Sequence, residues 1–451
     1  MKINRIMLSD SYKYSHTSQY PTGSESMFCY MEARSDRVYD KTVFFGLQYI
    51  IQKYFSTPIE MWEVDEAESF AKMHGEPFDR IGWDYIVNEC KGYLPIRIKA
   101  VKEGSVIPNH NVLMTIESTD KNVFWIPSFL ETLLMKVWYS TTIATKSYFV
   151  KQLILSYLKE TGTPESIGFK YHNFGDRGSS SVESAAIGGM AHLTQFKGTD
   201  NFNSLRYAKE YYDCDMAGFS IPATEHSTVT SHGKEGRFNM YEQYIENFKS
   251  YAIIACVMDS YDIFEDTKYI TTGSFKKKIE SENYPFFVIR PDSGNPVEVL
   301  NALLNIMEEN SVAYTINEKG YKVFKKYGFI WGDGITPATI KEILEYVIDR
   351  GYSADIISFG SGGDLMQNIN RDTLGFAIKC SSITVNGIER EVFKNPVTDH
   401  SKVSKKGVLD LIMVEGEYVT VNGVNKNSVL QVVYENGVIL NKISLTDIRD
   451  N

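Results

Sequence analysis

Residues 286–296 read FFVIRPDSGNP, an apolar run that ends abruptly in a polar loop. Four apolar residues in succession are typical of a strand that is buried on both faces. The loop places Arg290 and Asp292 close together, and residues 297–308 then carry apolar side chains at helical spacing. The stretch therefore predicts one strand, one polar loop and one helix, in that order.

The same order recurs at three other places in the chain. Apolar runs at 251–258, 329–331 and 356–359 end in the loops DSYD, GDG and GSGGD. Four such units predict an α/β fold with a barrel-like parallel sheet. Loops at the carboxyl ends of barrel strands hold the chemistry, so we expect their polar residues and glycines to converge: Asp259, Arg290, Asp292, Asp333, Gly362 and Gly363. One loop alone would be explained equally well as an ordinary turn.

The composition argues against several classes of protein. A chain of 451 residues with 43% hydrophobic residues is long enough for two or three globular domains. Its net charge of −10 argues against nucleic acid as a partner. Five cysteines without a CxxC pair favour a reducing compartment, and we find neither a signal peptide nor an apolar run long enough for a membrane span. We expect a cytoplasmic protein without membrane or nucleic-acid partners.

A second domain is indicated at both ends of the chain. Residues 96–116 alternate apolar and polar side chains as an antiparallel ribbon does, and residues 381–451 contain repeated Asn-Gly and Glu-Gly turn signals. We expect the C-terminal hairpins to pair with the ribbon in a discontinuous α+β domain. The expected boundaries are 1–150 and 381–451 for this domain and 151–380 for the barrel-like catalytic domain. Residues 42–54 and 123–158 are expected to be helical.

Two further stretches resemble ligand-binding loops. Residues 172–181, HNFGDRGSSS, place Arg177 among glycines and serines ahead of a helix, where backbone N–H groups favour an anion. Serines that only cap the helix would explain this pattern equally well. Residues 218–227, GFSIPATEHS, contain His226, and Glu225 could hold one nitrogen of its ring. A lone histidine is more often structural than catalytic.

The candidate residues suit a phosphorylated sugar. Carboxylates such as Asp259, Asp292 and Asp333 suit sugar hydroxyls and Mg²⁺, which prefers oxygen ligands. The glycine backbone at 362–363 suits phosphates together with four basic side chains: Arg177, Arg290, Arg371 and Lys379. The sequence has no Walker motif and no GxGxxG at dinucleotide spacing.

Aromatic side chains complete the set of candidates. Phe174 and Tyr12 could enclose a flat ring. A flat ring, a ribose and phosphates together indicate transfer of a phosphoribosyl group. A glycosidase barrel with a carboxylate pair is the alternative, but it gives the clustered arginines and glycines no role.

The motifs, taken together, resemble the nicotinamide phosphoribosyltransferase family over nearly the whole chain. They occur in the family's order and include DSYKYSH at 10–16, FFGLQYI at 44–50, HNFGDRG at 172–178, GFSIPATEHS at 218–227, IRPDSGNP at 289–296, ISFGSGGDL at 357–365 and FKNPVTDHSKVSKKG at 393–407. The resemblance implies a type II phosphoribosyltransferase that makes nicotinamide mononucleotide and pyrophosphate from nicotinamide and phosphoribosyl pyrophosphate with Mg²⁺. It also implies a homodimer with sites at the subunit interface and stimulation by ATP, which phosphorylates His226.

The resemblance also implies a role for each candidate. Phe174 and Tyr12 of the partner subunit would stack on the pyridine ring beside Arg177, with the amide facing Asp200, Ser220 and Asp10. The ribose would contact Asp292 and Arg290, magnesium would involve Asp259 and Asp292, and the 5′-phosphate region would comprise Gly332, Asp333, Gly362 and Gly363. The pyrophosphate clamp would come from the partner subunit's Arg34, Arg371 and Lys379, with the partner subunit's Lys394 and Lys402 nearby.

The acidic residue at 200 bears on which substrate is used. An ionised Asp200 accepts a hydrogen bond from a carboxamide N–H but repels a carboxylate, so nicotinamide is expected over nicotinic acid. A nicotinate-preferring relative and a non-catalytic nucleotide-binding protein on the same fold are the alternatives. The chain departs from the family pattern at Asp176, where tyrosine is expected, at Asn173, where aspartate is expected, and at Ala377, where a serine often joins the clamp.

Overall fold

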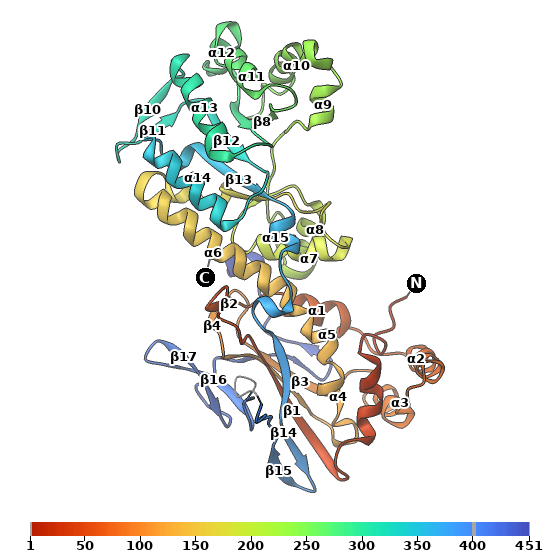
Figure 1. Ribbon diagram of the computed structural model, residues 1–451. Coiled ribbons are helices and arrows are strands. Elements are labelled where there is room, and N and C mark those ends of the chain that lie inside the picture. The colour runs from red at the N-terminus through yellow and green to blue at the C-terminus, as the bar shows by residue number, and fades with distance from the viewer. Residues whose placement is uncertain (1, 399–402, 451) are drawn as a thin grey trace. The chain divides into compact units, whose positions relative to one another are not determined.

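The computed structural model describes residues 2–398 and 403–450. Its contacts divide the chain into two compact units, each of which contains its own large sheet (Figure 1). Unit 1 comprises Met1–Thr145, Tyr207–Asp215 and Ile369–Asn451, and unit 2 comprises Lys146–Arg206 and Met216–Asn368. The chain therefore passes between the units after residues 145, 206, 215 and 368. The boundaries expected from the sequence followed residues 150 and 380.

Unit 2 contains a six-stranded sheet in which every neighbouring pair of strands is parallel. The strand order is β7 (Gly198–Thr199), β6 (Tyr171–Asn173), β13 (Ile357–Ser361), β12 (Tyr327–Trp331), β9 (Phe286–Arg290) and β8 (Ile253–Val257). The FFVIR run thus forms an inner strand, as its apolar character predicts. The α/β class and the barrel-like parallel sheet expected from the sequence are confirmed.

A short segment links the two edges of this sheet. Within residues 219–224, which we call the closing segment, Phe219 exchanges backbone hydrogen bonds with the strand at β7. At the other end, the Ala255 N–H of β8 donates to Pro222 O (3.0 Å) and Thr224 N–H donates to Ala255 O (3.1 Å). The sheet therefore curls, and the closing segment connects its edges.

Helices follow the strands of unit 2 at the positions that the sequence indicates. After β9, Asn295 accepts a hydrogen bond from the N–H of Glu298 and caps α13 (Pro296–Glu309). After β12, Thr336 caps α14 (Pro337–Asp349) in the same way. Proline at the first helical position supports both starts, because its missing N–H has no partner there. The other helices of this unit are α6 (Val137–Thr161, shared with unit 1), α7 (Val182–His192), α8 (Phe202–Tyr212, shared), α9 (His226–Thr230), α10 (Gly233–Asn247), α11 (Ile263–Ile270), α12 (Gly273–Ile279) and α15 (Gly363–Gln367).

Unit 1 contains a seven-stranded antiparallel sheet. Its order is β15 (Ile388–Glu391), β14 (Ala377–Val385), β1 (Ser24–Glu32), β5 (Val112–Ser118), β3 (Ile96–Ala100), β18 (Gln431–Glu435) and β19 (Val438–Ile439). The pairing of β18 with β3 confirms that C-terminal hairpins join the ribbon near residue 100. Three hairpins, including β16 (Leu409–Val414) with β17 (Glu417–Asn422), turn through two residues with positive φ: Asn386-Gly387, Glu415-Gly416 and Asn436-Gly437.

One helix prediction for unit 1 is partly wrong. The helix expected at 42–54 covers only α1 (Leu47–Tyr54), because Lys41–Val43 forms β2 and pairs with β4 (Val106–Pro108). Gly46 has φ +105°, a left-handed conformation that ends the extended segment and precedes the helix. The stretch at 123–158 is helical but broken into α4 (Ile126–Phe129), α5 (Glu131–Met135) and α6. No helix in the described ranges is long and apolar enough to cross a membrane.

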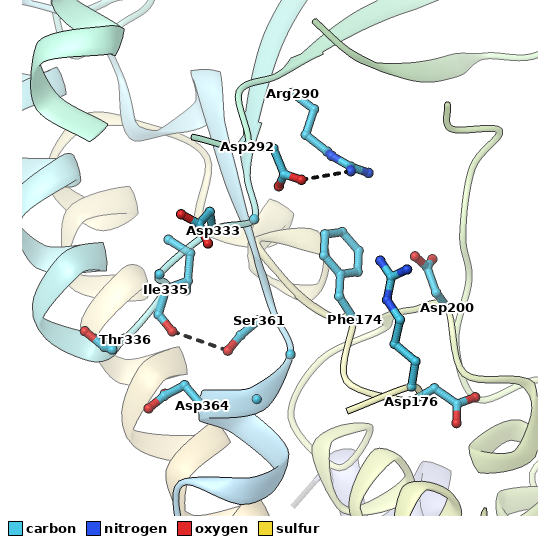
Figure 2. A pocket seen from close by; sticks show the side chains of 15 residues that line it. Phe174, Asp176, Asp200, Arg290, Asp292, Asp333, Ile335, Thr336, Ser361 and Asp364 are labelled. Carbon is cyan, nitrogen blue, oxygen red and sulfur yellow. Dashed lines mark hydrogen bonds and ion pairs between the residues drawn. The ribbon is translucent and has the colours of Figure 1, made fainter. Parts of the chain in front are cut away.

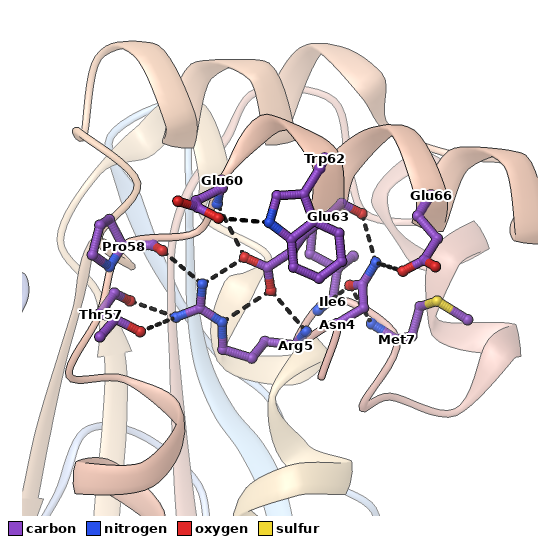
Figure 3. A network of polar contacts seen from close by, with 10 residues as sticks. All are labelled: Asn4, Arg5, Ile6, Met7, Thr57, Pro58, Glu60, Trp62, Glu63 and Glu66. Atoms are coloured by element: carbon purple, nitrogen blue, oxygen red, sulfur yellow. Dashed lines mark hydrogen bonds and ion pairs between the residues drawn. The ribbon is translucent and has the colours of Figure 1, made fainter. Parts of the chain in front are cut away.

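Hydrogen bonds fix the N-terminal segment of unit 1 to α2 (Met61–His74) (Figure 3). The guanidinium of Arg5 pairs with Glu63 and donates to the carbonyl oxygens of Thr57 (2.5 Å) and Pro58 (2.6 Å). Burial acts to raise the pKa of Glu63, but the hydrogen bonds from Arg5 and Glu60 and the charge of Arg5 together hold that pKa below its usual value. These contacts therefore anchor the segment at Arg5, shortly before Asp10 and Tyr12.

Candidate active site

A cavity of about 580 Å³ opens at the carboxyl ends of the unit 2 strands (Figure 2). Its lining comprises Phe174, Asp176, Arg177, Asp200, Arg290, Asp292, Gly332, Asp333, Gly334, Ile335, Thr336, Ser361, Gly362, Gly363 and Asp364. These residues follow the ends of β6, β7, β9, β12 and β13. Three of the four loops expected to converge, those after β9, β12 and β13, therefore line one cavity, whereas Asp259 after β8 does not line it and instead accepts hydrogen bonds from Asp292 and Ser293. Nine of the lining residues were candidates from the sequence.

The Phe174 ring projects into the cavity because the neighbouring strand has no side chain in its way (Figure 2). A Cβ atom added to Gly360 of β13 would lie 1.9 Å from Cε2 of Phe174. The backbone N–H of Phe174 donates to Ser361 O (2.9 Å), which fixes the start of the loop. Glycine at 360 thus allows an aromatic ring to lie directly on the sheet.

Asp200 lines the cavity together with Phe174 and Arg177. Ser220, from the closing segment, donates its hydroxyl to Asp200 Oδ1 at 2.6 Å. The backbone N–H of Asp200 donates to Asn173 O (3.1 Å). The closing segment therefore holds one carboxylate oxygen, and Asp200 retains acceptor capacity for a ligand.

A chain of hydrogen bonds runs from the cavity to His226. Asp292 lies in the cavity and pairs with Arg290 through Oδ2 (Nη2 to Oδ2, 3.3 Å). Its backbone N–H donates to Asp259 Oδ2 (3.1 Å), and the Ser293 hydroxyl donates to the same oxygen (2.5 Å). Asp259 Oδ1 lies 2.9 Å from Nε2 of His226. The expectation that Glu225 holds His226 is wrong, because Glu225 accepts a hydrogen bond from Ser227 and the nearly buried Asp259 takes that position.

The cavity carries more negative than positive charge. Five aspartates line it against two arginines, Arg177 and Arg290. The Nε of Arg290 is buried and has no hydrogen-bond partner among the described residues. Arg290 lines the cavity, and its guanidinium has further N–H donors beyond the ion pair with Asp292.

No cluster of three or more potential metal ligands occurs in the described part of the chain. Asp259 already accepts three hydrogen bonds, whereas Asp292 uses only Oδ2 in its ion pair. The donor set suits a cation that has one or two carboxylate ligands and draws the rest from water and phosphate, as Mg²⁺ commonly does.

The basic candidates for the pyrophosphate clamp lie in unit 1. Arg34, Lys379 and Lys394 are close enough that the charges of the other two lower the pKa of Lys379, although burial is the largest cause. Lys405 also contributes, and its own amine pairs with Glu32. We call Arg34, Lys379, Lys394 and Lys405 the basic cluster. Arg371 is exposed and pairs with Asp372 (3.3 Å), and Lys402 lies outside the described residues.

The remaining candidates of unit 1 lie near its N-terminus. Asp10 Oδ2 accepts a hydrogen bond from the Thr132 hydroxyl (2.8 Å). Tyr12 is 55% exposed, and its only ring neighbour among the described residues is His16, 5.0 Å away between centroids. An exposed tyrosine of this kind has an apolar face available to a ligand or another chain.

The three departures from the family pattern have different surroundings. Asp176 lines the cavity and adds to its negative charge. Asn173 is fully buried, and its Oδ1 accepts the N–H of Gly175 (2.8 Å) while its Nδ2 has no partner in the described ranges. An asparagine here keeps the loop hydrogen bond without burying a charge. Ala377 begins β14 opposite Glu32 of β1.

Sequence reasoning missed several residues that shape the cavity. Gly360 was inside a quoted motif, yet its contact with Phe174 depends on which strands are neighbours. Ser293 was also unremarked, although a serine directly after Asp292 is a local signal. Asp364 and its partner Lys146 were missed as well, and a lone lysine in the apolar stretch 137–150 could have indicated them.

Comparisons with known proteins show the family of the chain. The nicotinate phosphoribosyltransferase (NAPRTase) family matches residues 169–438, and the nicotinamide phosphoribosyltransferase N-terminal domain matches residues 4–98. A protein of Xanthomonas campestris pv. campestris (strain 8004), named nicotinamide phosphoribosyltransferase, is 44% identical over 99% of this chain and 97% of its own length. The chain belongs to the nicotinamide phosphoribosyltransferase family.

Other members and structures of known fold extend the comparison. A nicotinamide phosphoribosyltransferase of Acinetobacter baylyi (strain ATCC 33305 / BD413 / ADP1) is 32% identical over 99% of this chain and 97% of its own length. The crystal structure of nicotinate-nucleotide pyrophosphorylase from Pyrococcus furiosus has a TM-score of 0.62 at 14% identity and covers 99% of this chain and 94% of its own. That structure shares the fold of this nicotinamide phosphoribosyltransferase family member.

Proposed function

We propose that the protein transfers the phosphoribosyl group of 5-phosphoribosyl 1-pyrophosphate to nicotinamide and so makes nicotinamide mononucleotide for NAD salvage. The observation that carries this proposal is the composition of the unit 2 cavity. One part of its lining has the aromatic ring of Phe174 and the carboxylate of Asp200. Another part has the carboxylate of Asp292 and the glycine backbone at Gly362 and Gly363. The names of the relatives that are 44% and 32% identical support the same reaction.

Recognition of the amide would fall to Asp200. Because Ser220 occupies Oδ1, Oδ2 remains to accept an N–H of the carboxamide. Nicotinic acid presents a carboxylate at the same place, which Asp200 and the neighbouring Asp176 would repel. Phe174 would stack on one face of the pyridine ring, and Arg177 would lie beside it. Tyr12 and Asp10 of the partner subunit would complete this end of the site.

The sugar and its phosphates would occupy the other end. Asp292 would accept hydrogen bonds from the ribose hydroxyls, and the guanidinium of Arg290 would donate to an oxygen of the ligand. Gly332, Asp333, Gly362 and Gly363 would surround the 5′-phosphate region. Asp292 would hold Mg²⁺, and Asp259, which accepts the backbone N–H of Asp292, would support that position. A bound Mg²⁺ would neutralise charge on the diphosphate.

The negative charge of the cavity supports a site completed by a second chain. A pyrophosphate group needs cations, and five aspartates against two arginines do not provide an excess. The basic cluster, with Arg371 and Lys402, would supply them as the partner subunit's clamp in a homodimer. An obligate interface follows from this arrangement, and a fully active monomer would contradict it.

Catalysis would rest on positioning and electrostatics. The pyridine nitrogen would attack C1 of the ribose as the bond from C1 to the pyrophosphate oxygen breaks, and the electron pair leaves with pyrophosphate. No general base is required, because the attacking nitrogen carries no proton. Phe174 and Asp200 would orient the ring, while the clamp would stabilise charge on the leaving group.

His226 is the proposed link to ATP. A carboxylate can only accept, so Asp259 assigns the proton to Nε2 and leaves the lone pair on Nδ1. Transfer of the γ-phosphoryl group would form an N–P bond at Nδ1 and release ADP, and the contact with Asp259 would remain. The added negative charge would attract basic side chains and favour binding of the diphosphate.

A competition assay tests the proposed reaction. The protein is incubated with Mg²⁺, phosphoribosyl pyrophosphate and equal nicotinamide and nicotinic acid, and products are identified by mass. We expect nicotinamide mononucleotide, and we expect Asp200→Ser to reduce the preference for the amide by about tenfold, the value of one charged hydrogen bond. Gly168→Ala, at a position absent from the cavity lining, serves as a control.

Each other outcome favours an alternative. Acid mononucleotide as the main product would assign the chain to nicotinate use and overturn the role of Asp200. Absence of both products would favour a non-catalytic nucleotide-binding protein.

A further inference from the structure

A buried lysine lies behind the cavity wall. Lys146 is the only charged residue between positions 137 and 150, in the middle of α6, and it is 4% exposed. A buried ammonium group is unfavourable unless it is paired and hydrogen-bonded. Lys146 therefore needs an anionic partner, and that partner is a residue that lines the cavity.

That partner is Asp364, 218 residues away in sequence. The Nζ of Lys146 donates to the main-chain oxygen of Asp364 (2.6 Å) and lies 2.6 Å from its Oδ2 as an ion pair. The other carboxylate oxygen accepts from Nδ2 of Asn368 (2.9 Å). Burial lowers the pKa of Lys146 and Asp364 opposes this shift, as expected for a partly desolvated pair.

Asp364 occupies a position where an unpaired carboxylate would oppose anion binding. It lines the cavity next to Gly362 and Gly363, where the proposed function places the 5′-phosphate region. The Asp364 side chain is 15% exposed, so solvent screens its charge only in part. Without a cation, this wall would repel a phosphate.

We propose that Lys146 is a positioning residue that neutralises Asp364 and holds its main chain, so that this wall of the cavity accepts a phosphate. The proposal rests on the proposed function for the identity of the ligand. Lys146 acts through Asp364 and lies outside the cavity lining. The pair would thus set the affinity for the sugar phosphate and leave the ring-binding end unchanged.

Calorimetric titration with ribose 5-phosphate tests the proposal without turnover. This probe carries the 5′-phosphate and lacks both the diphosphate and the ring. We expect Lys146→Met to weaken its binding about tenfold, because an uncompensated Asp364 then faces the ligand. We expect Asp364→Asn to tighten binding about twofold to tenfold, because the charge of Lys146 is then unopposed. The double variant should bind within about threefold of wild type.

The opposite signs of the two single variants distinguish neutralisation from a structural role. If Lys146 only stabilises the fold, both single variants disturb the same pair and both weaken binding. Lys170→Met is the matched control: Lys170 is also a buried lysine of unit 2 that donates to main-chain oxygens, those of Asp355 (2.7 Å) and Ile357 (3.3 Å), but these partners do not line the cavity as Asp364 does. It should lower the melting temperature without changing ribose 5-phosphate affinity.

Each result decides the matter. Weaker binding in Asp364→Asn would overturn the proposal even if the lysine variant does not fold. A double variant as weak as a folded Lys146→Met would overturn it as well. Failure of wild type to bind ribose 5-phosphate would overturn it too. A wild type that binds the probe but does not turn over nicotinamide, with the expected opposite signs in the variants, would uphold this inference and refute the proposed function.

Discussion

The two units of the protein gather opposite charges by different means. In unit 2, the carboxyl ends of parallel strands bring aspartates into one cavity, with five aspartates against two arginines. In unit 1, neighbouring antiparallel strands β1 and β14 and the segment after them bring together the basic cluster. The cavity is defined by shape and acceptors, whereas the cluster is defined by positive charge. Unit 2 thus supplies the carboxylates of the proposed site, and unit 1 supplies the cations of the proposed clamp.

The largest expected effect tests the role of shape in unit 2. Gly360→Ala places a Cβ atom 1.9 Å from the present position of Phe174 Cε2, so the ring must move. We expect kcat/KM for nicotinamide to fall about 100-fold, as for other misplacements of an oriented group. Gly168→Ala is the matched control, because its Cβ would meet only Lys197, at an ordinary 3.6 Å. Steady-state kinetics showing equal values for both variants would refute the role assigned to the ring.

The next effect tests the role of charge in unit 1. Lys379→Met removes a cation from the basic cluster, and we expect the KM for phosphoribosyl pyrophosphate to rise about tenfold or more. Because the pKa of Lys379 is lowered, its ammonium loses its proton at a lower pH than an ordinary lysine. Affinity for the diphosphate should therefore fall as pH rises through this lowered pKa, and Lys379→Arg should shift the fall to higher pH. A pH profile of KM that is identical in wild type and Lys379→Arg would contradict this assignment.

Mixed dimers make the same test sharper. A chain with Lys379→Met and a chain with Asp292→Asn each lack one half of the proposed site. If the basic cluster serves the neighbouring subunit, an equal mixture recovers about a quarter of wild-type activity, since half the dimers carry one intact site. A mixture no more active than the separate variants would place both halves of each site in one chain.

The smallest effect concerns His226, where phosphorylation would add negative charge to unit 2. His226→Ala should abolish the response to ATP, which we expect to be about tenfold in kcat/KM, because no Nδ1 remains to accept the phosphoryl group. Turnover without ATP should remain, since His226 does not line the cavity. His232→Ala is a control that removes a nearby histidine. An ATP response that persists in His226→Ala would refute the proposed coupling.

Local pattern was sufficient to predict much of the fold. The apolar runs and polar loops predicted β9 with α13 and β12 with α14, because each strand, cap and helix is determined by neighbours in sequence. The paired turn residues Asn386-Gly387 and Asn436-Gly437 likewise marked hairpins, because both positions need positive φ. Convergence of the loops followed from the parallel sheet, in which the carboxyl ends of all strands lie at one edge.

Side-chain contacts between residues far apart in sequence could not be predicted in the same way. Glu225 was expected to hold His226 because it is adjacent, yet Asp259 does so from 33 residues away. The steric contact between Gly360 and Phe174 and the pair Lys146 and Asp364 also depend on the strand order β7-β6-β13-β12. That order is set by packing of the whole unit, which no short pattern contains.

The closing segment has a consequence for the behaviour of the protein in concentrated solution. Open edges of a sheet can recruit a strand from another chain and so begin aggregation. Residues 219–224 occupy backbone groups of both β7 and β8, so those groups are not available to a foreign strand. The same segment carries Ser220, which holds Asp200. An insertion here would expose two edges and release a cavity carboxylate at once, which makes this loop a poor site for an engineered tag.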